Sequence, residues 1–278
     1  MVRSKVTPDE FQIFKKYIYD SSGIALEPGK EYLLETRLNS LLHEYDCSTF
    51  HALYQKAKSD ITNKLQEKII DAISTNETYF FRDKTPFELL QYKIIPDLID
   101  KRSKKGQKPS LRLWSAASST GQEIYSIAMT LDEMGISTSN YSIRLLGTDI
   151  SDSAVAQASY GSYNKFEVSR GLEQKKLIKY FDEKGDSWRI KDQIRIMVQF
   201  NKMNLMKPFP NIGKFDIILC RNVMIYFTAE DRKKIYTSLA RTLEPDGYLL
   251  IGSTESLNNV TDLFQSQRYL KSTFYQFK

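Results

Sequence analysis

The stretch SAASSTGQEIYSIAM, residues 115–129, decides how the chain is predicted to fold. It follows the apolar run LRLW at 111–114 and leads into a helical pattern, which predicts a strand, a turn and a helix. The turn consists of small residues up to Gly121. It lacks both the G-x-G-x-x-G pattern of dinucleotide sites and the G-x-x-x-x-G-K pattern of nucleotide-phosphate sites. The turn therefore predicts a ligand that lies against backbone and needs no phosphate cradle.

Short apolar runs recur along the chain after residue 110, with helical patterns between several of them. They are LRLWSA (111–116), YSIRLLGTDI (141–150), KFDIILC (214–220) and GYLLIGS (247–253). Strands that alternate with helices form parallel sheets, so residues 110–278 are predicted to form an α/β domain. Residues 160–200 break the alternation, and WRIKDQIRIMVQF (188–200) is interpreted as strand–turn–strand in a small β insertion. This insertion serves either substrate or partner contact or a structural role.

Residues 1–82 carry helical patterns, which predict an all-α domain. Thr7-Pro8-Asp9-Glu10 is a helix start, with Thr as cap, Pro in the first turn and acids at the positive helix end. This helix is predicted to end at Ser21-Ser22-Gly23. Three more helices are expected near 32–42, 49–58 and 61–73. The short connections between them indicate a small antiparallel bundle.

Residues 83–109 are predicted to be a linker, with a helix from Pro86 to about residue 101 and then a basic loop. The run KRSKKGQK, 101–108, is the densest basic stretch in a chain of net charge +6. It is either a solvated loop or a surface that attracts an acidic partner. Nucleic acid is a possible partner but not a required one, because the run has no interleaved aromatic residues and the chain has no finger or helix-turn-helix signature.

The composition favours a cytoplasmic protein. The chain is 41% hydrophobic and has no run of 18 apolar residues, and its N-terminus lacks the apolar core of a secretory signal. Its two cysteines, Cys47 and Cys220, do not make a disulfide framework, which fits a reducing compartment.

The ligand of the small-residue turn is predicted to be a nucleoside. LLGTDI places Asp149 at the end of a strand, where a carboxylate accepts hydrogen bonds from ribose hydroxyls. The alternative is that Asp149 caps the following helix. S-adenosylmethionine has a ribose and an adenine but no phosphate, so we predict that the turn holds its methionine part.

The predicted chemistry is methyl transfer to a carboxylate. The two histidines, His43 and His51, lie in the helical part, so an acid–base enzyme is not favoured. A glutamate is already ionised at pH 7 and needs only to be brought to the methyl donor. Arg82 is suited to hold a carboxylate and Tyr226 to orient an oxygen. Alternatively, Arg82 pairs with Asp83 or a helix end and Tyr226 is a core ring.

Six blocks, in this order, resemble the CheR-type chemotaxis receptor methyltransferases. They are TNETYFFRD, LWSAASSTGQEIYSIAM, LGTDIS, NLM, FDIILCRNVMIYF and LEPDGYLLIGSTESL. The resemblance covers essentially the whole chain. It implies a Rossmann-like S-adenosylmethionine-dependent methyltransferase domain with a small antiparallel β-subdomain, preceded by an all-α domain. It also implies methyl esterification of specific glutamates on the cytoplasmic region of bacterial chemoreceptors, with S-adenosylhomocysteine as product.

The resemblance implies the site residues as well. The implied cofactor contacts are Asn76, Thr78, Arg82, Glu123, Asp149, Asn204, Leu205, Arg221 and Asn222. Arg82 and Tyr226 are the implied substrate-orienting, catalytic pair, and no metal is expected. The implied partners are methyl-accepting chemoreceptors, including a C-terminal receptor tether that docks on the β-subdomain. The protein is expected to be a monomer recruited to receptor arrays, without membrane insertion.

Two features depart from the family pattern. Many relatives read G-E-E-P-Y-S where this chain has Gly121-Gln122-Glu123-Ile124-Tyr125-Ser126. The family's helical domain is thought to present a basic face to the receptor, whereas residues 1–85 hold 12 Lys and Arg against 13 Asp and Glu. Such a face needs local clustering, for example of Lys15, Lys16, Lys30 and Arg37, or the basic middle section.

A nucleic-acid methyltransferase and a non-catalytic sensor of S-adenosylmethionine remain as alternative functions. The (N/D)-P-P-(Y/F) motif of one common type of nucleic-acid N-methyltransferase does not occur in this sequence.

Overall fold

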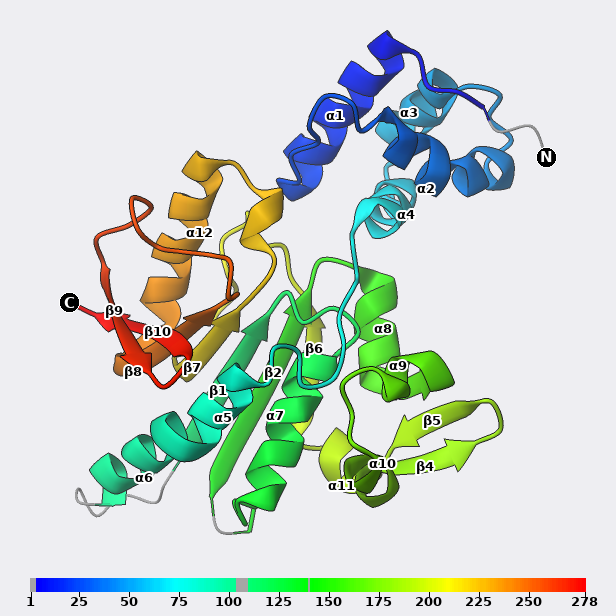
Figure 1. Ribbon diagram of the computed structural model, residues 1–278. Coiled ribbons are helices and arrows are strands. Elements are labelled where there is room, and N and C mark those ends of the chain that lie inside the picture. Colours follow the sequence, from blue (N-terminus) through cyan, green and yellow to red (C-terminus); the bar gives the residue numbers. More distant parts are fainter. Residues whose placement is uncertain (1–3, 104–109, 140) are drawn as a thin grey trace.

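The chain forms a helical domain set against the end of a large β-sheet (Figure 1). The computed structural model describes residues 4–103, 110–139 and 141–278. Most of the basic run at 101–108 therefore lies outside the described residues. None of the described helices is both long enough and apolar enough to cross a membrane.

The helical domain consists of α1 (Pro8–Ser22), α2 (Glu31–Glu44), α3 (Phe50–Ser59) and α4 (Lys64–Ile73). The predicted start and end of the first helix are confirmed. Thr7 and Glu10 form a capping box, and Gly23 ends α1 with φ +81°, a left-handed conformation that favours glycine. The helices bury one shared apolar core, which includes Phe14, Ile18, Leu34, Leu38, Phe50, Leu53 and Ile69.

A continuous helical stretch follows the segment that connects the two domains, and it packs against the sheet. It comprises α5 (Thr85–Leu89), the π-helical turn η1 (Leu90–Ile94) and α6 (Ile95–Ser103). The predicted linker helix is thus present. Its side chains Phe87, Leu90 and Ile94 are buried in the core of the α/β domain. The helix is therefore an integral layer of that domain.

The large sheet has seven strands in the order β6-β2-β1-β7-β8-β10-β9. The strands are β1 (Ser110–Ala116), β2 (Ser142–Asp149), β6 (Val198–Lys202), β7 (Phe215–Cys220), β8 (Leu243–Ile251), β9 (Phe264–Tyr269) and β10 (Ser272–Phe277). The first five along the chain pair in parallel, whereas β10 is antiparallel to β8 and to β9. The carboxyl ends of β1 and β2 point toward the helical domain (Figure 1). The predicted α/β fold is confirmed.

Alternate residues of the central strands enter two separate cores, as the two-residue period of a strand requires. On β7, Ile217 and Leu219 join one core, which also holds α5 to α7 and the small β-subdomain. Ile218 and Cys220 join the other core, under α12 (Ala229–Thr242). Helices α7 (Gln122–Glu133) and α8 (Asp152–Tyr160) complete the layers. Both faces of the sheet are covered, so its apolar runs are nearly continuous.

The small β-subdomain follows α8. It contains β3 (Ser162–Asn164), α9 (Lys165–Ser169), α10 (Gln174–Tyr180), β4 (Phe181–Lys184), β5 (Ser187–Ile190) and α11 (Asp192–Arg195). Its three strands form a separate antiparallel sheet, β3-β5-β4. The strand–turn–strand interpretation of 188–200 is wrong in two respects. A helix, α11, separates the strands, and the second strand, β6, pairs in parallel with β2 in the large sheet.

We expect one buried hydrogen bond to stabilise this sheet. Trp114 is fully buried, and its indole N–H donates to the Thr148 hydroxyl at 2.9 Å. Thr148→Val keeps the shape but leaves that N–H unpaired, which costs about 1–3 kcal/mol. The control, Thr130→Val, removes a buried hydroxyl that only donates, to the Ser126 carbonyl within α7, and should cost less. Urea unfolding followed by circular dichroism measures both, and equal losses would contradict the assignment.

Candidate functional site

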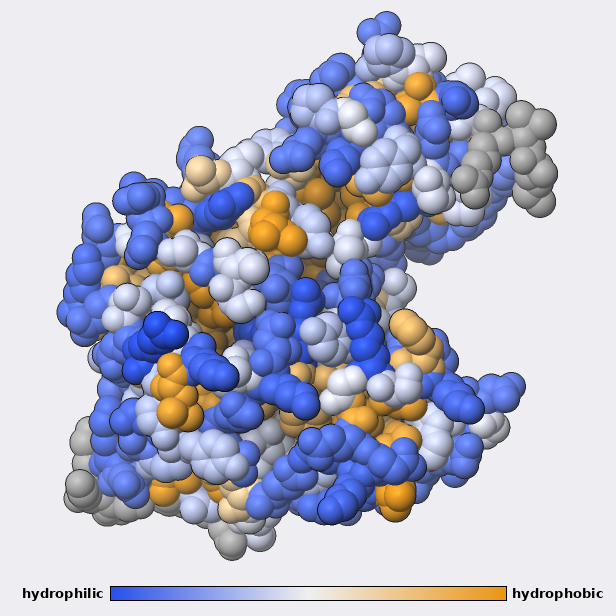
Figure 2. All heavy atoms as spheres, in the orientation of Figure 1, coloured by the Kyte–Doolittle hydropathy of each residue, from blue (hydrophilic) through white to orange (hydrophobic). Residues whose placement is uncertain are grey.

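A pocket lies at the carboxyl edge of the parallel strands, under the helical domain. The space outside its protein atoms is about 940 Å³, with the open mouth included. All ten predicted site residues line it. They are Asn76, Thr78, Arg82, Glu123, Asp149, Asn204, Leu205, Arg221, Asn222 and Tyr226. These residues come from five separate regions of the sequence, which meet around one cavity. Figure 2 shows hydrophobic residues at the surface where the two domains meet.

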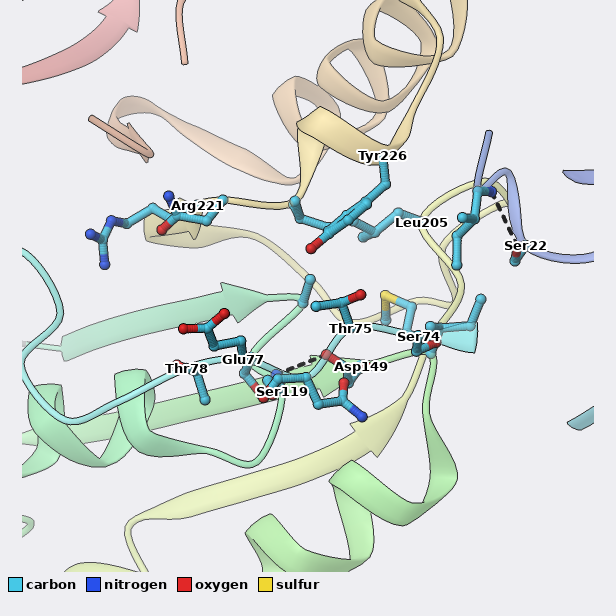
Figure 3. A pocket seen from close by; sticks show the side chains of 18 of the residues that line it. Ser22, Ser74, Thr75, Glu77, Thr78, Ser119, Asp149, Leu205, Arg221 and Tyr226 are labelled. Carbon is cyan, nitrogen blue, oxygen red and sulfur yellow. Dashed lines mark hydrogen bonds between the residues drawn. The ribbon is translucent and has the colours of Figure 1, made fainter. Parts of the chain in front are cut away.

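The small-residue turn and Asp149 form one wall of the pocket. Asp149 is 6% exposed, and its carboxylate accepts the backbone N–H of Ser119 at 2.8 Å (Figure 3). It also accepts the backbone N–H of Ser151 at 3.0 Å. Burial raises the pKa of Asp149, and the two N–H donors partly offset this effect. The alternative role of Asp149 as helix cap is wrong, because the Ser151 hydroxyl caps α8. The carboxylate lines the pocket, with lone pairs left for a ligand.

The same wall has backbone and packing requirements that explain its small residues. Ala117 and Ser119 have φ of +61° and +50°, and Gly121 has φ +93°. A side chain at Gly147 would place its Cβ 2.6 Å from the Phe200 ring and 2.9 Å from the Ser118 hydroxyl. Non-glycine residues with positive φ store strain and cluster at functional sites. Of ten such residues in the described ranges, six lie in segments around this pocket, namely Phe81, Asp83, Lys84, Ala117, Ser119 and Asn222.

The wall fits S-adenosylmethionine. The Ser118 hydroxyl is buried, lines the pocket and has no hydrogen-bond partner among the described residues. Such an orphaned group is costly unless a ligand or water pairs with it. The Asp149 carboxylate offers the acceptors that a ribose diol needs, and the turn leaves its backbone open to a ligand without phosphate. The donor set therefore suits a nucleoside with an amino-acid tail.

A buried ion-pair network forms beside this wall. Arg221 at the end of β7 has a side chain only 1% exposed. Its guanidinium donates to Glu123 at 2.6 Å and to Asp83 at 2.7 Å. Glu123 also accepts from the Ser115 hydroxyl at 2.8 Å. Glu123 and Arg221, predicted as cofactor contacts, are thus bonded to each other, and Figure 3 shows the Arg221 side chain directed away from Asp149.

The opposite wall is the loop after β7. Asn222 has φ +58°, and its backbone N–H donates to Glu255 at 2.9 Å. Glu255 also accepts from the N–H groups of Met224 at 3.0 Å and Gly252 at 2.6 Å, so it holds the loops after β7 and β8 together. Tyr226 ends the short 3₁₀ helix η2 (Met224–Tyr226), and its ring projects into the pocket (Figure 3). It is half-buried, so it is not a core ring.

The helical domain closes the pocket from above. Asn204 donates from its side chain to the Ser21 carbonyl at the end of α1, at 2.9 Å. The backbone N–H of Ala25 donates to the Tyr226 carbonyl at 2.9 Å. Leu205 is 7% exposed and belongs to the core beneath α12. Asn204 therefore contributes to the joint between the domains as well as to the pocket lining.

Arg82 lies on the segment that runs from α4 across the strand ends to α5. Its guanidinium donates to the Glu77 carbonyl at 3.1 Å and lies 5.7 Å from the centre of the Tyr79 ring. The alternative pairing with Asp83 is wrong, since Asp83 is bonded to Arg221. Asn76 holds the start of this segment in place, because its carbonyl accepts from Ser119 at 3.0 Å.

Several residues of the site were not predicted. Asp83 and Glu255 lie inside recognised blocks but act through hydrogen bonds to distant segments, which no local pattern indicates. Ser118 belongs to the small-residue turn, and only the structure shows that its hydroxyl is buried without a partner among the described residues. Glu77 stood inside a recognised block, and its place in the pocket lining could have been expected from its neighbours Asn76 and Thr78.

Family models match almost the whole chain. The model described as "CheR methyltransferase, all-alpha domain" matches residues 9–74, and "CheR methyltransferase, SAM binding domain" matches residues 76–272. The chain is 38% identical to "Chemotaxis protein methyltransferase Cher2" of Pseudomonas putida, over 97% of this chain and 98% of the relative. It is 37% identical to "Chemotaxis protein methyltransferase 1" of Pseudomonas aeruginosa, with the same coverage, and 35% identical to "Chemotaxis protein methyltransferase" of Vibrio parahaemolyticus, over 100% of both chains.

We expect the two carboxylates around Arg221 to differ in their importance. The Glu123 side chain is 11% exposed and that of Asp83 is 29% exposed. Glu123→Gln leaves a buried cation short of its more buried partner and should lower the free energy of unfolding by about 3 kcal/mol. Asp83→Asn should cost about 1 kcal/mol or less, because water screens that pair. Urea unfolding of both variants tests this, and a larger loss for Asp83→Asn would contradict it.

Proposed function

Because this chain belongs to the CheR methyltransferase family, we propose that it methylates specific glutamate side chains on the cytoplasmic region of bacterial chemoreceptors. The expected family and the expected cofactor, S-adenosylmethionine, are confirmed, and the chain is a chemotaxis methyltransferase. The product ester and its receptor substrate are the proposed part. S-adenosylhomocysteine would be the second product.

The observation that carries the proposal is the placement of Arg82 and Tyr226 in the same pocket as Asp149. Asp149 and the small-residue turn suit the nucleoside, while a guanidinium and a phenol occupy the other walls. Neither histidine lines this pocket, since His43 lies in α2 and His51 in α3. An ionised glutamate needs no general base to accept a methyl group.

In the proposed mechanism, the protein orients two reactants. S-adenosylmethionine supplies a methyl group on a positively charged sulfur, a strong leaving group. Asp149 would hold the ribose, the turn after β1 the methionine part, and Asn76, Thr78, Asn204, Leu205 and Asn222 the rest of the cofactor. Arg82 would bind the acceptor carboxylate, and Tyr226 would orient one of its oxygens. A carboxylate oxygen would bond to the methyl carbon as the carbon–sulfur bond breaks, with the sulfur leaving in line. Because this step would cancel opposite charges, a water-poor site would favour it.

Glu123 and Arg221 would contribute mainly by position. Their charges already neutralise each other, so neither offers a full charge to the cofactor. The pair instead fixes the end of β7 against α7. Its second partner, Asp83, follows Arg82 directly and so ties that residue's segment to the same cation.

The proposed setting is cytoplasmic, with the protein recruited as a monomer to receptor arrays. A receptor tether would dock on the β-subdomain. In the basic face suggested for the helical domain, the Arg37 guanidinium keeps its charge but is held by hydrogen bonds to the Ile73 and Ser74 carbonyls at the end of α4. Lys16 is paired with Asp20 at 2.8 Å. Attraction to an acidic receptor would then rest on Arg37 and on cations such as Lys15 and Lys30.

The chemical nature of the product tests the proposal. The protein is mixed with methyl-labelled S-adenosylmethionine and a chemoreceptor cytoplasmic fragment, and the product is treated with mild alkali. We expect label on the receptor that alkali releases as volatile methanol, because esters hydrolyse and N-methyl groups do not. A fragment whose acceptor glutamates are replaced by alanine is the control. Label that resists alkali would indicate N-methyl groups, the product expected of a nucleic-acid methyltransferase. A complete lack of methyl transfer would favour a non-catalytic sensor of S-adenosylmethionine.

We expect Arg82 and Tyr226 to affect turnover rather than folding. Arg82→Ala should lower kcat for methyl transfer at least about a hundredfold, the scale of losing one preorganised electrostatic contact. Tyr226→Phe, which removes a single hydroxyl, should lower kcat about tenfold or more. Tyr92→Phe is the matched control, because Tyr92 is 60% exposed on η1 and does not line the pocket. Unchanged turnover of Arg82→Ala would remove that residue from the mechanism.

A further inference from the structure

The β-subdomain contacts the segment that carries Arg82. Arg170, in the connection between α9 and α10, donates from its guanidinium to the Glu77 carboxylate at 2.8 Å. The same guanidinium lies 4.4 Å from the centre of the Tyr79 ring. Glu77 lines the pocket, and Tyr79 is the ring beside which Arg82 lies. One side chain of the subdomain therefore contacts two residues of the segment 76–82, which carries Arg82.

The backbone beside Arg170 packs just as closely. Gly171 has φ +82°, and a Cβ there would come within 2.0 Å of the Phe80 carbonyl oxygen. The Phe80 ring is fully buried, with ring centres 5.0 Å from Tyr163 and 5.4 Å from Phe181 of the subdomain. Only glycine permits this approach, so the loop at 170–171 and the segment at 79–80 are fitted to each other.

The ends of the segment are fixed from the other side, by the α/β domain. The Asn76 carbonyl accepts from Ser119, and the Phe81 N–H donates to Ser126 at 2.9 Å. Between these anchors, Glu77 has an exposed side chain and Tyr79 is half-buried. Arg82 then folds back and donates to the Glu77 carbonyl. Arg170 thus contacts the part of the segment that the anchors leave to solvent.

We propose that Arg170 is a positioning residue for methyl transfer. Its guanidinium pairs with the Glu77 carboxylate and lies against the Tyr79 ring, and these two contacts hold the conformation in which Arg82 and Thr78 face the pocket. The pKa of Glu77 is lowered by the hydrogen bond and charge of Arg170, so Glu77 is ionised at neutral pH and the pair persists. The subdomain is then part of the catalytic apparatus, and it acts through Arg170. The role in transfer rests on the function proposed above.

The test compares four variants by turnover, by binding of S-adenosylhomocysteine and by amide hydrogen exchange of residues 76–82. Arg170→Ala should lower kcat about tenfold, the scale of a small misplacement of a substrate-orienting group. It should also speed exchange in 76–82 about tenfold. Arg170→Lys keeps a cation near Glu77 and Tyr79 and should restore most of kcat. Arg195→Ala is the control, because Arg195 also pairs with an exposed carboxylate of the subdomain, Asp192, and should behave as wild type.

Glu77→Gln supplies the fourth variant and a coupling measurement. Glu77→Gln weakens the ion pair but leaves Arg170 beside Tyr79. Arg170→Ala should therefore lower kcat by a smaller factor in the Glu77→Gln variant than in the wild-type protein. Wild-type turnover and exchange in Arg170→Ala, or equal losses in Arg170→Ala and Arg195→Ala, would overturn the proposal. If the wild-type protein methylates no receptor, the proposed function fails, whereas exchange and S-adenosylhomocysteine binding still decide whether Arg170 holds the segment.

Discussion

The buried guanidinium of Arg221 is the constraint on which the site depends. A cation that is 1% exposed is tolerable only with carboxylates at hydrogen-bonding distance, and Glu123 and Asp83 provide them. These three residues come from the end of β7, the first turn of α7 and the segment before α5. Satisfying one charge therefore fixes three segments that also carry Asn222 and Arg82. This electrostatic requirement therefore helps to fix both pocket walls.

The helical domain completes the pocket instead of merely covering it. The Asn204 side chain donates to the Ser21 carbonyl, and the Ala25 backbone N–H donates to the Tyr226 carbonyl. The end of α1 and the loop after it are thus hydrogen-bonded to two residues that line the pocket. On another flank, Lys202 of β6 pairs with Glu67 of α4 and with Asp152 of α8. A change in the angle between the domains would therefore move the lining residues Ser22 and Ile24 of the helical domain relative to Asp149 and Tyr226. Binding at the pocket and the arrangement of the domains are physically linked.

In the proposed mechanism, the site orients its reactants and transfers no proton. Its polar groups are an acceptor carboxylate, a guanidinium, a phenol and several amides, and many of them are fixed by backbone hydrogen bonds. Residues with positive φ, such as Ser119 and Asn222, show that the local backbone is held in strained conformations by its surroundings. Such preorganisation suits a displacement whose reactants arrive already charged. The β-subdomain adds to it through the contacts of Arg170.

The sequence by itself determined the two domains, the parallel strands and the family, because hydrophobic period, caps and turn residues are local properties. It also placed Asp149 and Arg82 at strand and segment ends, where a parallel sheet brings ligand groups together. Only the tertiary structure decided that Arg221 pairs with Glu123 and that β6 leaves the insertion to join the large sheet. Each of these outcomes depends on which buried charge or strand edge finds a partner far along the chain. That competition among distant groups has no signature in a local pattern.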